Sequence, residues 1–178
     1  FNWVTLSGLA AEQGLTYHNL YHLSAEGTGN GRLYNISREF ERSPCIVYSD
    51  DWGQTWTYGG KLSVPTTGSS YSNGYYKFTS NGVDRIDFIA TEHHPRDYNN
   101  SIYHGYIQGG KSYDSNGTEI DNDIFDETAP GPEEFTPVFL AGPIAAGEHH
   151  TAWTIELELD DNGYPVCLFI TRYGTDIY

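Results

Sequence analysis

The residues best suited to chemistry lie close together in the middle of the chain, over 91–106. This stretch holds three histidines, three tyrosines, two asparagines and an arginine. Histidine and tyrosine side chains act as general acids and bases, and arginine pairs with carboxylates. We therefore take His94, His104 and Tyr103 as candidate catalytic residues, with Arg96 and Asn100 as candidate substrate contacts. A structural role is the alternative for each, because a histidine before proline can bond backbone in a turn and a tyrosine can simply pack.

The elements that position these residues are strands. The stretch is interpreted as a loop that joins two β-strands at one end of a sheet, followed by the second of those strands. Side chains alternate between the two faces of a strand. Ile102 and His104 are therefore expected on one face and Tyr103 on the other. Tyr103 and His104 can serve one site only if a bulge breaks that alternation.

A unit of strand, polar turn ending in glycine, and second strand recurs along the chain. The turns end at Gly82 and Gly163 in two copies, and the first copy runs through Gly31. Further strands follow the first two copies, over 43–49 with 55–62 and over 101–107 with 111–120. Four antiparallel strands repeated in this way are typical of propeller blades. The sequence predicts an all-β partial β-propeller over 1–178, with four-stranded antiparallel blades over 16–62, 75–120 and 151–178 and an insertion over 122–150.

Between two of these strands, Ser49, Asp51, Gly53, Thr55 and Trp56 fit the pattern S-x-D-x-G-x-T-W. The pattern resembles the Asp-box of sialidases and related BNR-repeat propellers. It indicates a tight turn in which Asp51 accepts hydrogen bonds and Gly53 takes a positive φ. In that family the box lies away from the catalytic face, so the motif bears on fold rather than on chemistry.

The wider sequence is similar to the BNR-4 family of secreted carbohydrate-active proteins. The likeness is carried by 16–20, 32–38, the Asp-box, His94-Pro95-Arg96, 101–104 and 110–118, and it resumes over about 151–170. It implies a larger ring, of about seven blades in some members, which the rest of the propeller, in the same or another chain, must complete. Some members are ulvan lyases that cleave uronate-containing polysaccharide by β-elimination.

Such a reaction requires a base for the C5 proton, an acid for the departing O4 and a cation that neutralises the uronate carboxylate. The resemblance therefore implies acid–base roles for His94, His104 and Tyr103. It implies substrate contacts for Arg96, for Arg38 in the preceding blade, for Asn100 and for Tyr173. Alternatives are a non-catalytic carbohydrate-binding propeller and a sialidase-type glycoside hydrolase, although no F/Y-R-I-P motif precedes the box. A β-sandwich is the alternative fold.

The composition of the chain limits the classes of molecule that it is expected to bind. The 178 residues carry a formal charge of −15, which argues against nucleic acid and leaves binding of an acidic polysaccharide to local cations. No apolar run is long enough to cross a bilayer, and the resemblance implies a secreted, extracellular or periplasmic protein. No cofactor is required. A structural calcium or zinc ion stays an open alternative because of the acidic loops near 121–127 and the pair His149-His150.

Overall fold

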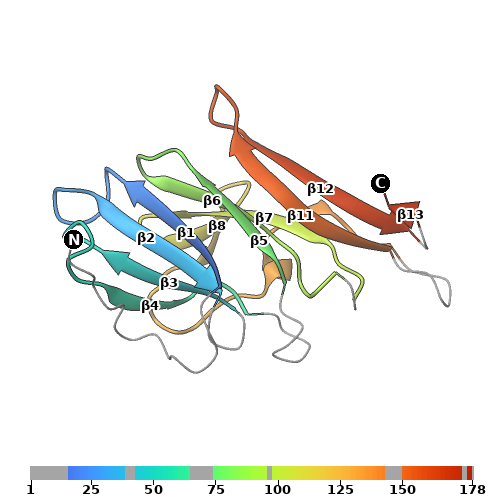
Figure 1. The fold of residues 1–178 in the computed structure, drawn as a ribbon, viewed down its shortest axis with the longest axis horizontal. Helices are drawn as coiled ribbons and strands as arrows, with labels where there is room; N and C mark the ends of the chain where they lie inside the picture. Colours follow the sequence, from blue (N-terminus) through green and yellow to red (C-terminus); the bar gives the residue numbers. More distant parts are fainter. Residues whose placement is uncertain are drawn as a thin grey trace.

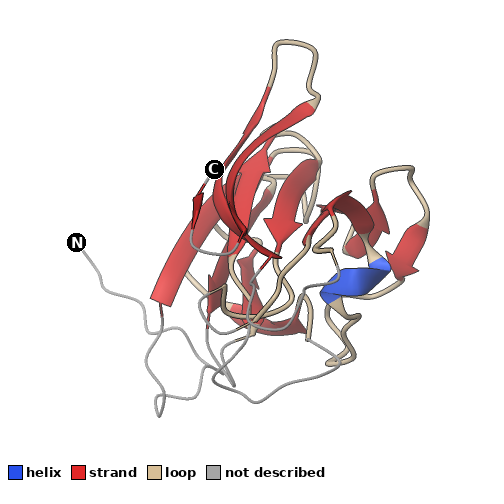
Figure 2. Ribbon diagram, turned by 90° about the vertical axis from the view of Figure 1, so that its right-hand side faces the viewer, coloured by secondary structure: helices blue, strands red, loops and turns tan. Residues whose placement is uncertain are grey.

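The structure is a computed structural model that describes residues 16–38, 43–64, 74–95, 98–142, 150–173 and 176–177. Its regular structure consists of antiparallel strands and a short 3-10 helix, η2 (Pro132–Glu134) (Figure 2). The predicted all-β class is therefore confirmed. The strands form three successive sheets that lie side by side in chain order (Figure 1).

The first sheet is an antiparallel meander of four strands in sequence order. Its strands are β1 (Thr16–Leu23), β2 (Arg32–Arg38), β3 (Pro44–Ser49) and β4 (Thr57–Lys61). Apolar and polar residues alternate along β2, so that Tyr34 and Ile36 face the second sheet. These four strands correspond to the unit expected over 16–62.

The second sheet contains six strands, five of them in sequence order. They are β5 (Tyr76–Ser80), β6 (Arg85–Ala90), β7 (Ile102–Gln108), β8 (Lys111–Asp114), β9 (Glu119–Asp121) and β10 (Thr136–Phe139). The stretch 111–120, expected as one strand, is divided between β8 and β9 by the turn at 115–118. β10 comes from the expected insertion and pairs with the first part of β7, whereas β8 pairs with the later part. The two strands thus follow one another along the same edge of β7.

The third sheet consists of β11 (His150–Leu159), β12 (Pro165–Tyr173) and the short β13 (Asp176–Ile177). Its long hairpin packs through β11 against β5, β6 and β7. In Figure 1 this hairpin lies at the right, with β11 beside β5.

The second sheet is the middle layer, and each of its faces buries a separate apolar cluster. One face packs Phe78, Phe88 and Tyr103 against Tyr34 and Ile36 of the first sheet. The other face packs Ile89 and Ile102 against Ala152 and Leu157 of the third sheet. Burial of these side chains is the main force that stacks the sheets.

The three antiparallel sheets follow one another in chain order. The described residues form no closed ring, so the structure establishes the antiparallel all-β architecture, and the assignment of the sheets as propeller blades stays a proposal. Cys45, which is buried, and Cys167, which is partly buried, do not form a disulfide.

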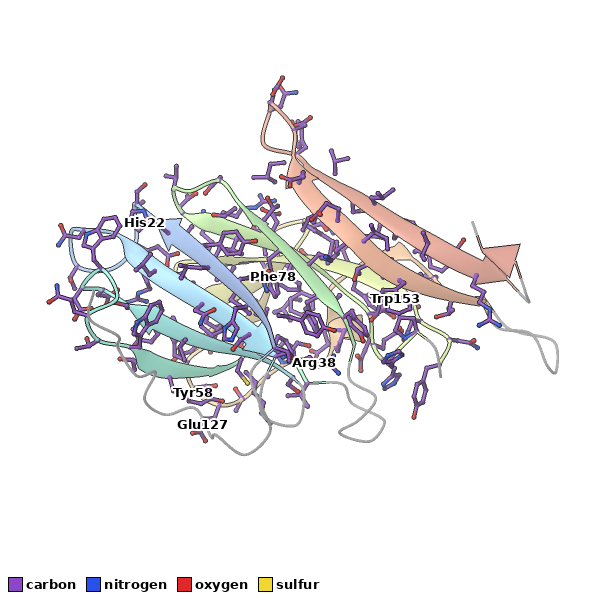
Figure 3. The ribbon with its side chains drawn as sticks, in the orientation of Figure 1. His22, Arg38, Tyr58, Phe78, Glu127 and Trp153 are labelled. Carbon is purple, nitrogen blue, oxygen red and sulfur yellow. The ribbon has the colours of Figure 1, made fainter. Side chains whose placement is uncertain are left out.

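The two ends of the sheets differ. Turns such as 24–31, 81–84 and 160–164 lie at one end, which we call the turn end. At the opposite end the first strand of each sheet begins and the second strand ends, as the backbone pairs Thr16–Arg38, Tyr76–Ala90 and His150–Tyr173 show. We call this the loop end. Figure 3 shows Arg38 there, at the far end of the first sheet from His22.

Candidate functional site

The loop end gathers side chains from all three sheets into one cluster. Arg38 closes β2, Tyr75 immediately precedes β5, and His94 follows β6. The Arg38 guanidinium lies 5.2 Å from the centroid of the Tyr75 ring. The hydroxyl of Tyr75 lies 3.2 Å from Nε2 of His94, which is hydrogen-bonding distance. A cation, a phenol and an imidazole are therefore in direct contact.

Two further aromatic residues flank this group. Trp153 of β11 packs against Tyr75 and His94, with ring centroids 5.3 and 5.8 Å away. Tyr17 of β1 lies edge-on to Tyr75 at 5.8 Å, and Arg38 stands 5.7 Å from its ring. Tyr17 is 59% exposed and Trp153 is 37% exposed. We call Tyr17, Arg38, Tyr75, His94 and Trp153 the loop-end cluster.

The electrostatics of the cluster favour an anion. The side chain of Arg38 is partly buried, and its Nε has no hydrogen-bond partner within the described ranges. Its charge rests on two aromatic faces, an arrangement that stabilises a cation without neutralising it. Burial, followed by hydrogen bonding with Tyr75, raises the pKa of Tyr17, so this hydroxyl stays protonated at neutral pH.

Tyr17 also adopts an unusual backbone conformation. Its φ is +56°, in the left-handed region that residues with a Cβ rarely adopt. The register between β1 and β2 shifts at the same place, between Thr16 and Asn19. The side-chain amide of Asn19 donates to the carbonyl oxygen of Tyr17 at 2.6 Å. This irregular start to β1 directs the Tyr17 ring toward Tyr75.

Two hollows adjoin the cluster. The first measures about 30 Å³ and is lined partly by Tyr17, Arg38 and Tyr75, so it has room for about a water molecule or two. The second measures about 210 Å³ and lies beside Trp153, with Pro95 and Arg172 in its wall. A bulky ligand would therefore rest against the aromatic surface and in the second hollow.

The structure brings together some of the residues expected at the site. Arg38 and His94, which come from different sheets, meet through Tyr75. Arg96 lies outside the described residues. The backbone of Tyr173 pairs with that of His150 at the loop end, and the position of its side chain is not described.

Asn100 contributes to the shape of the loop. It is fully buried, its Oδ1 accepts from the His93 amide at 2.8 Å, and its Nδ2 donates to the His93 carbonyl at 2.8 Å. Both ends of its amide are thus used within the loop that carries His94. Asn100 therefore stabilises the loop. The sequence predicts a substrate contact at this residue instead.

Tyr103 and His104 lie on opposite faces of β7, as strand alternation requires. Tyr103 belongs to the cluster between the first two sheets, and its hydroxyl donates to Oε1 of Glu92 at 2.9 Å. Burial raises the pKa of Tyr103 to about 12. His104 is buried and contacts Asp87 and Ser115, whereas His94 contacts Tyr75. The two histidines therefore have different polar partners.

The sequence interpretation missed Tyr75, Tyr17, Trp153 and Arg172. A signal for the first three is present in the repeat. Each unit carries an aromatic residue at or near the start of its first strand, at Tyr17, Tyr75 and Trp153. Aligning the units on that strand would have placed all three at the same end of neighbouring sheets.

The Asp-box turn has the expected geometry and lies at the turn end. Asp51 accepts hydrogen bonds from the backbone N–H and hydroxyl of Thr55 at 2.8 and 2.7 Å, and the Ser49 hydroxyl donates to Asp51 at 2.7 Å. Gly53 has φ of +80°, and Trp56 Nε1 donates to its carbonyl at 3.2 Å. The hydrogen bonds from Thr55 and Ser49 lower the pKa of Asp51 to about 2.

Metal-binding groups and membrane-spanning helices are both absent from the part of the chain that the structure describes. In these ranges, no three or more His, Cys, Asp or Glu side chains are placed to hold a metal ion, and His149 lies outside them. The described part of the chain also contains no helix long and apolar enough to span a membrane.

Comparison with known proteins identifies no family for this chain. The sequence matches no protein-family model, and no curated protein matches it at a significant level. The resemblance to BNR-4 proteins therefore stays an expectation from the sequence, and the function proposed for the chain rests on the loop-end cluster.

Proposed function

We propose that the chain is part of a secreted β-propeller that cleaves a uronate-containing, ulvan-like polysaccharide by β-elimination. The observation that carries this proposal is the contact of Arg38, Tyr75 and His94 at the loop end. These residues supply the cation, the phenol and the imidazole that elimination from a uronate requires.

In the proposed reaction, the C5 proton and O4 lie on the same side of the sugar, next to the Tyr75 oxygen. The Tyr75 proton passes to Nε2 of His94, across the 3.2 Å contact, as the phenolate oxygen removes the C5 proton. The C4–O4 bond then breaks, a C4–C5 double bond forms, and Tyr75 gives the captured proton to O4. His94 finally returns its proton to Tyr75, so the pair ends as it began.

Arg38 is the proposed partner of the uronate carboxylate. Pairing with a cation makes the C5 proton more acidic, because the charge that develops on the carboxylate during its removal is stabilised. The side chain approaches from the sheet next to the one that carries Tyr75, which would place the carboxylate between the two sheets. Arg172, in the wall of the larger hollow, is a second cation on the path of an acidic polymer.

A non-catalytic carbohydrate-binding propeller is the second candidate function. The observation that favours it is the exposed aromatic pair Tyr17 and Trp153, since the flat apolar face of a sugar stacks on such rings. In that case Arg38 would supply affinity for acidic sugars, and Tyr75 and His94 would act only as hydrogen-bonding groups.

The experiment that tests the proposal measures the products formed from a panel of uronate polysaccharides. Elimination leaves an unsaturated uronate that absorbs in the near ultraviolet. Hydrolysis releases reducing ends without this absorbance, and a binding protein leaves the polymer intact. We expect absorbance to rise on at least one uronate polymer and to stay flat on the same polymer after its carboxyl groups are reduced. Retained binding without absorbance on every polymer would favour the second candidate.

A further inference from the structure

A second site lies in the middle sheet around the buried His104, at the edge of β7 where β8 and β10 meet. Its Nδ1 lies 2.7 Å from the hydroxyl of Ser115, and its Nε2 lies 3.1 Å from Oδ1 of Asp87. Asp87 is fully buried, whereas Ser115 lies in an exposed turn. A carboxylate, an imidazole and a serine hydroxyl are thus linked in a row that runs from the interior to the surface.

The topology of the sheet explains how Ser115 reaches His104. β8 ends at Asp114 and β10 begins at Thr136, both along the same edge of β7. Ser115 lies where these two strands meet, and its N–H donates to the hydroxyl of Thr136 at 2.9 Å. Because Thr136 is the backbone partner of His104, this contact holds Ser115 over the imidazole.

The turn itself does not need a serine at this place. Asp114 Oδ1 accepts hydrogen bonds from the N–H groups of Asn116 and Thr118. The turn of the third sheet makes the same bonds from Asn162 and Tyr164 to Asp160, and its second residue is Asp161 rather than serine. The Ser115 hydroxyl is therefore not consumed by the turn and is directed at His104.

The carboxylate end of the row is fixed by an arginine. Arg85 contacts both oxygens of Asp87, with its Nε 2.8 Å from Oδ2, and its guanidinium stacks 4.2 Å from the centroid of the Tyr106 ring. This pairing places a cation against both oxygens of the buried Asp87 carboxylate. A carboxylate oxygen beside Nε2 favours the tautomer in which Nε2 of His104 carries the proton and Nδ1 accepts one.

We propose that Ser115 is a nucleophile activated by His104 and oriented through Asp87, and that it attacks esters of small acyl groups presented from solvent. In the first step the Ser115 proton passes to Nδ1 of His104 while Oγ bonds to the acyl carbon. The bond from that carbon to the leaving oxygen breaks, and this oxygen takes the proton from His104. Water then repeats the sequence, releases the carboxylic acid and restores Ser115. This site does not depend on the function proposed for the loop end.

The backbone around Ser115 sets the expected rate. The N–H groups of Ser115, Asn116, Gly117 and Thr118 all have acceptors within the turn or on Thr136. They are therefore not available to stabilise an oxyanion unless the turn rearranges. In other enzymes, one donor that stabilises the oxyanion contributes roughly 10²–10³ in rate. We expect slow acylation by ordinary esters, faster acylation by an activated ester because of its better leaving group, and slow release of the acyl group.

The test treats the folded chain with a small alkyl fluorophosphonate and locates the label by mass spectrometry. Attack by Ser115 breaks the P–F bond and releases fluoride. We expect one label per chain at Ser115 and none at Ser24, which is exposed in another hairpin and serves as the unactivated control. Absence of label at Ser115, or equal labelling of Ser24, would overturn the proposal.

Two variants test the role of His104. Ser115→Ala changes an exposed side chain, and we expect it to fold normally and to lose the label. His104→Ala is expected to slow labelling by at least about 100-fold, with partial recovery on addition of imidazole. Unchanged labelling in a folded His104→Ala chain would contradict activation by His104. If this variant does not fold, the comparison of Ser115 with Ser24 in the unaltered chain decides the proposal.

Discussion

At the scale of single residues, the loop-end cluster combines groups that the sequence places far apart. Arg38 and His94 could be predicted because their residue types suit uronate chemistry and because Arg38 ends, and His94 follows, the second strand of a repeated unit. Tyr75 could not be predicted in the same way, since its role depends on its distances to Arg38, His94 and Trp153. Those distances are set by how three sheets stack, which no local pattern encodes.

Arg38 offers a test of the carboxylate contact. Arg38→Gln removes the charge while keeping a side chain of similar length, so we expect weaker binding of a uronate polymer and unchanged binding of its carboxyl-reduced form. A charge-assisted hydrogen bond contributes about 1.5–3 kcal/mol, which corresponds to roughly 10- to 150-fold in affinity. Affinity electrophoresis, in gels that contain one polymer or the other, measures the affinity for the uronate polymer and for its carboxyl-reduced form. Equal loss of binding to both polymers would indicate a general structural effect.

Asp51 offers a test at acid pH. Its pKa in the folded chain is lowered to about 2, from an ordinary value of 3.8. A lowered pKa contributes stability that is present above the unfolded-state value and is lost as pH falls toward the folded-state value. We therefore expect the difference in melting temperature between the unaltered chain and Asp51→Asn to shrink between about pH 4 and about pH 2. A difference that stays constant over this range would contradict the role assigned to the carboxylate.

At the scale of elements, the strands of the repeated units could be predicted well, whereas the extra strand could not. Alternating apolar residues and glycine turns predict β1 to β3 and β5 to β7 to within a few residues. β10 was missed because Pro137 and the acidic residues around it suggest a loop. It forms because the first part of β7 has an open edge that β8 does not cover.

Gly105 tests the packing of β7. A Cβ at this position would lie 2.5 Å from the Phe135 ring and 2.7 Å from Cζ of Phe88. Gly105→Ala is expected to lower the free energy of unfolding by about 1–3 kcal/mol through overpacking. Denaturant unfolding measures this cost. Adding Phe135→Leu should recover part of it in a double-mutant cycle, and strictly additive losses would contradict a steric conflict between these residues.

At the scale of the whole molecule, the outer face of the third sheet carries exposed apolar side chains. Val166 and Leu168 are 58% and 60% exposed, next to Ile155. In the proposed propeller, this face would pack against a further sheet of the ring. Exposed apolar surface of this kind promotes association in solution.

We expect the double substitution Val166→Ser and Leu168→Ser to reduce concentration-dependent association of the chain. Val83→Ser is the matched control, because Val83 is also exposed (50%) but lies in a turn between β5 and β6. Sedimentation velocity over a range of concentrations measures the difference. Equal behaviour of the two variants would show that this face does not drive association.

The most direct test of the central claim compares the unaltered chain with Tyr75→Phe on a uronate polysaccharide, by near-ultraviolet absorbance. The substitution removes one hydroxyl from the cluster, and we expect the rate of elimination to fall by about 10²–10⁴-fold with binding retained. Tyr21→Phe is the control, because the Tyr21 hydroxyl donates to the Phe78 carbonyl at 2.7 Å outside the cluster. It should cost about 1 kcal/mol of stability and leave the rate unchanged. Absorbance that rises equally in Tyr75→Phe, or that never rises in the unaltered chain, would contradict elimination at the loop end.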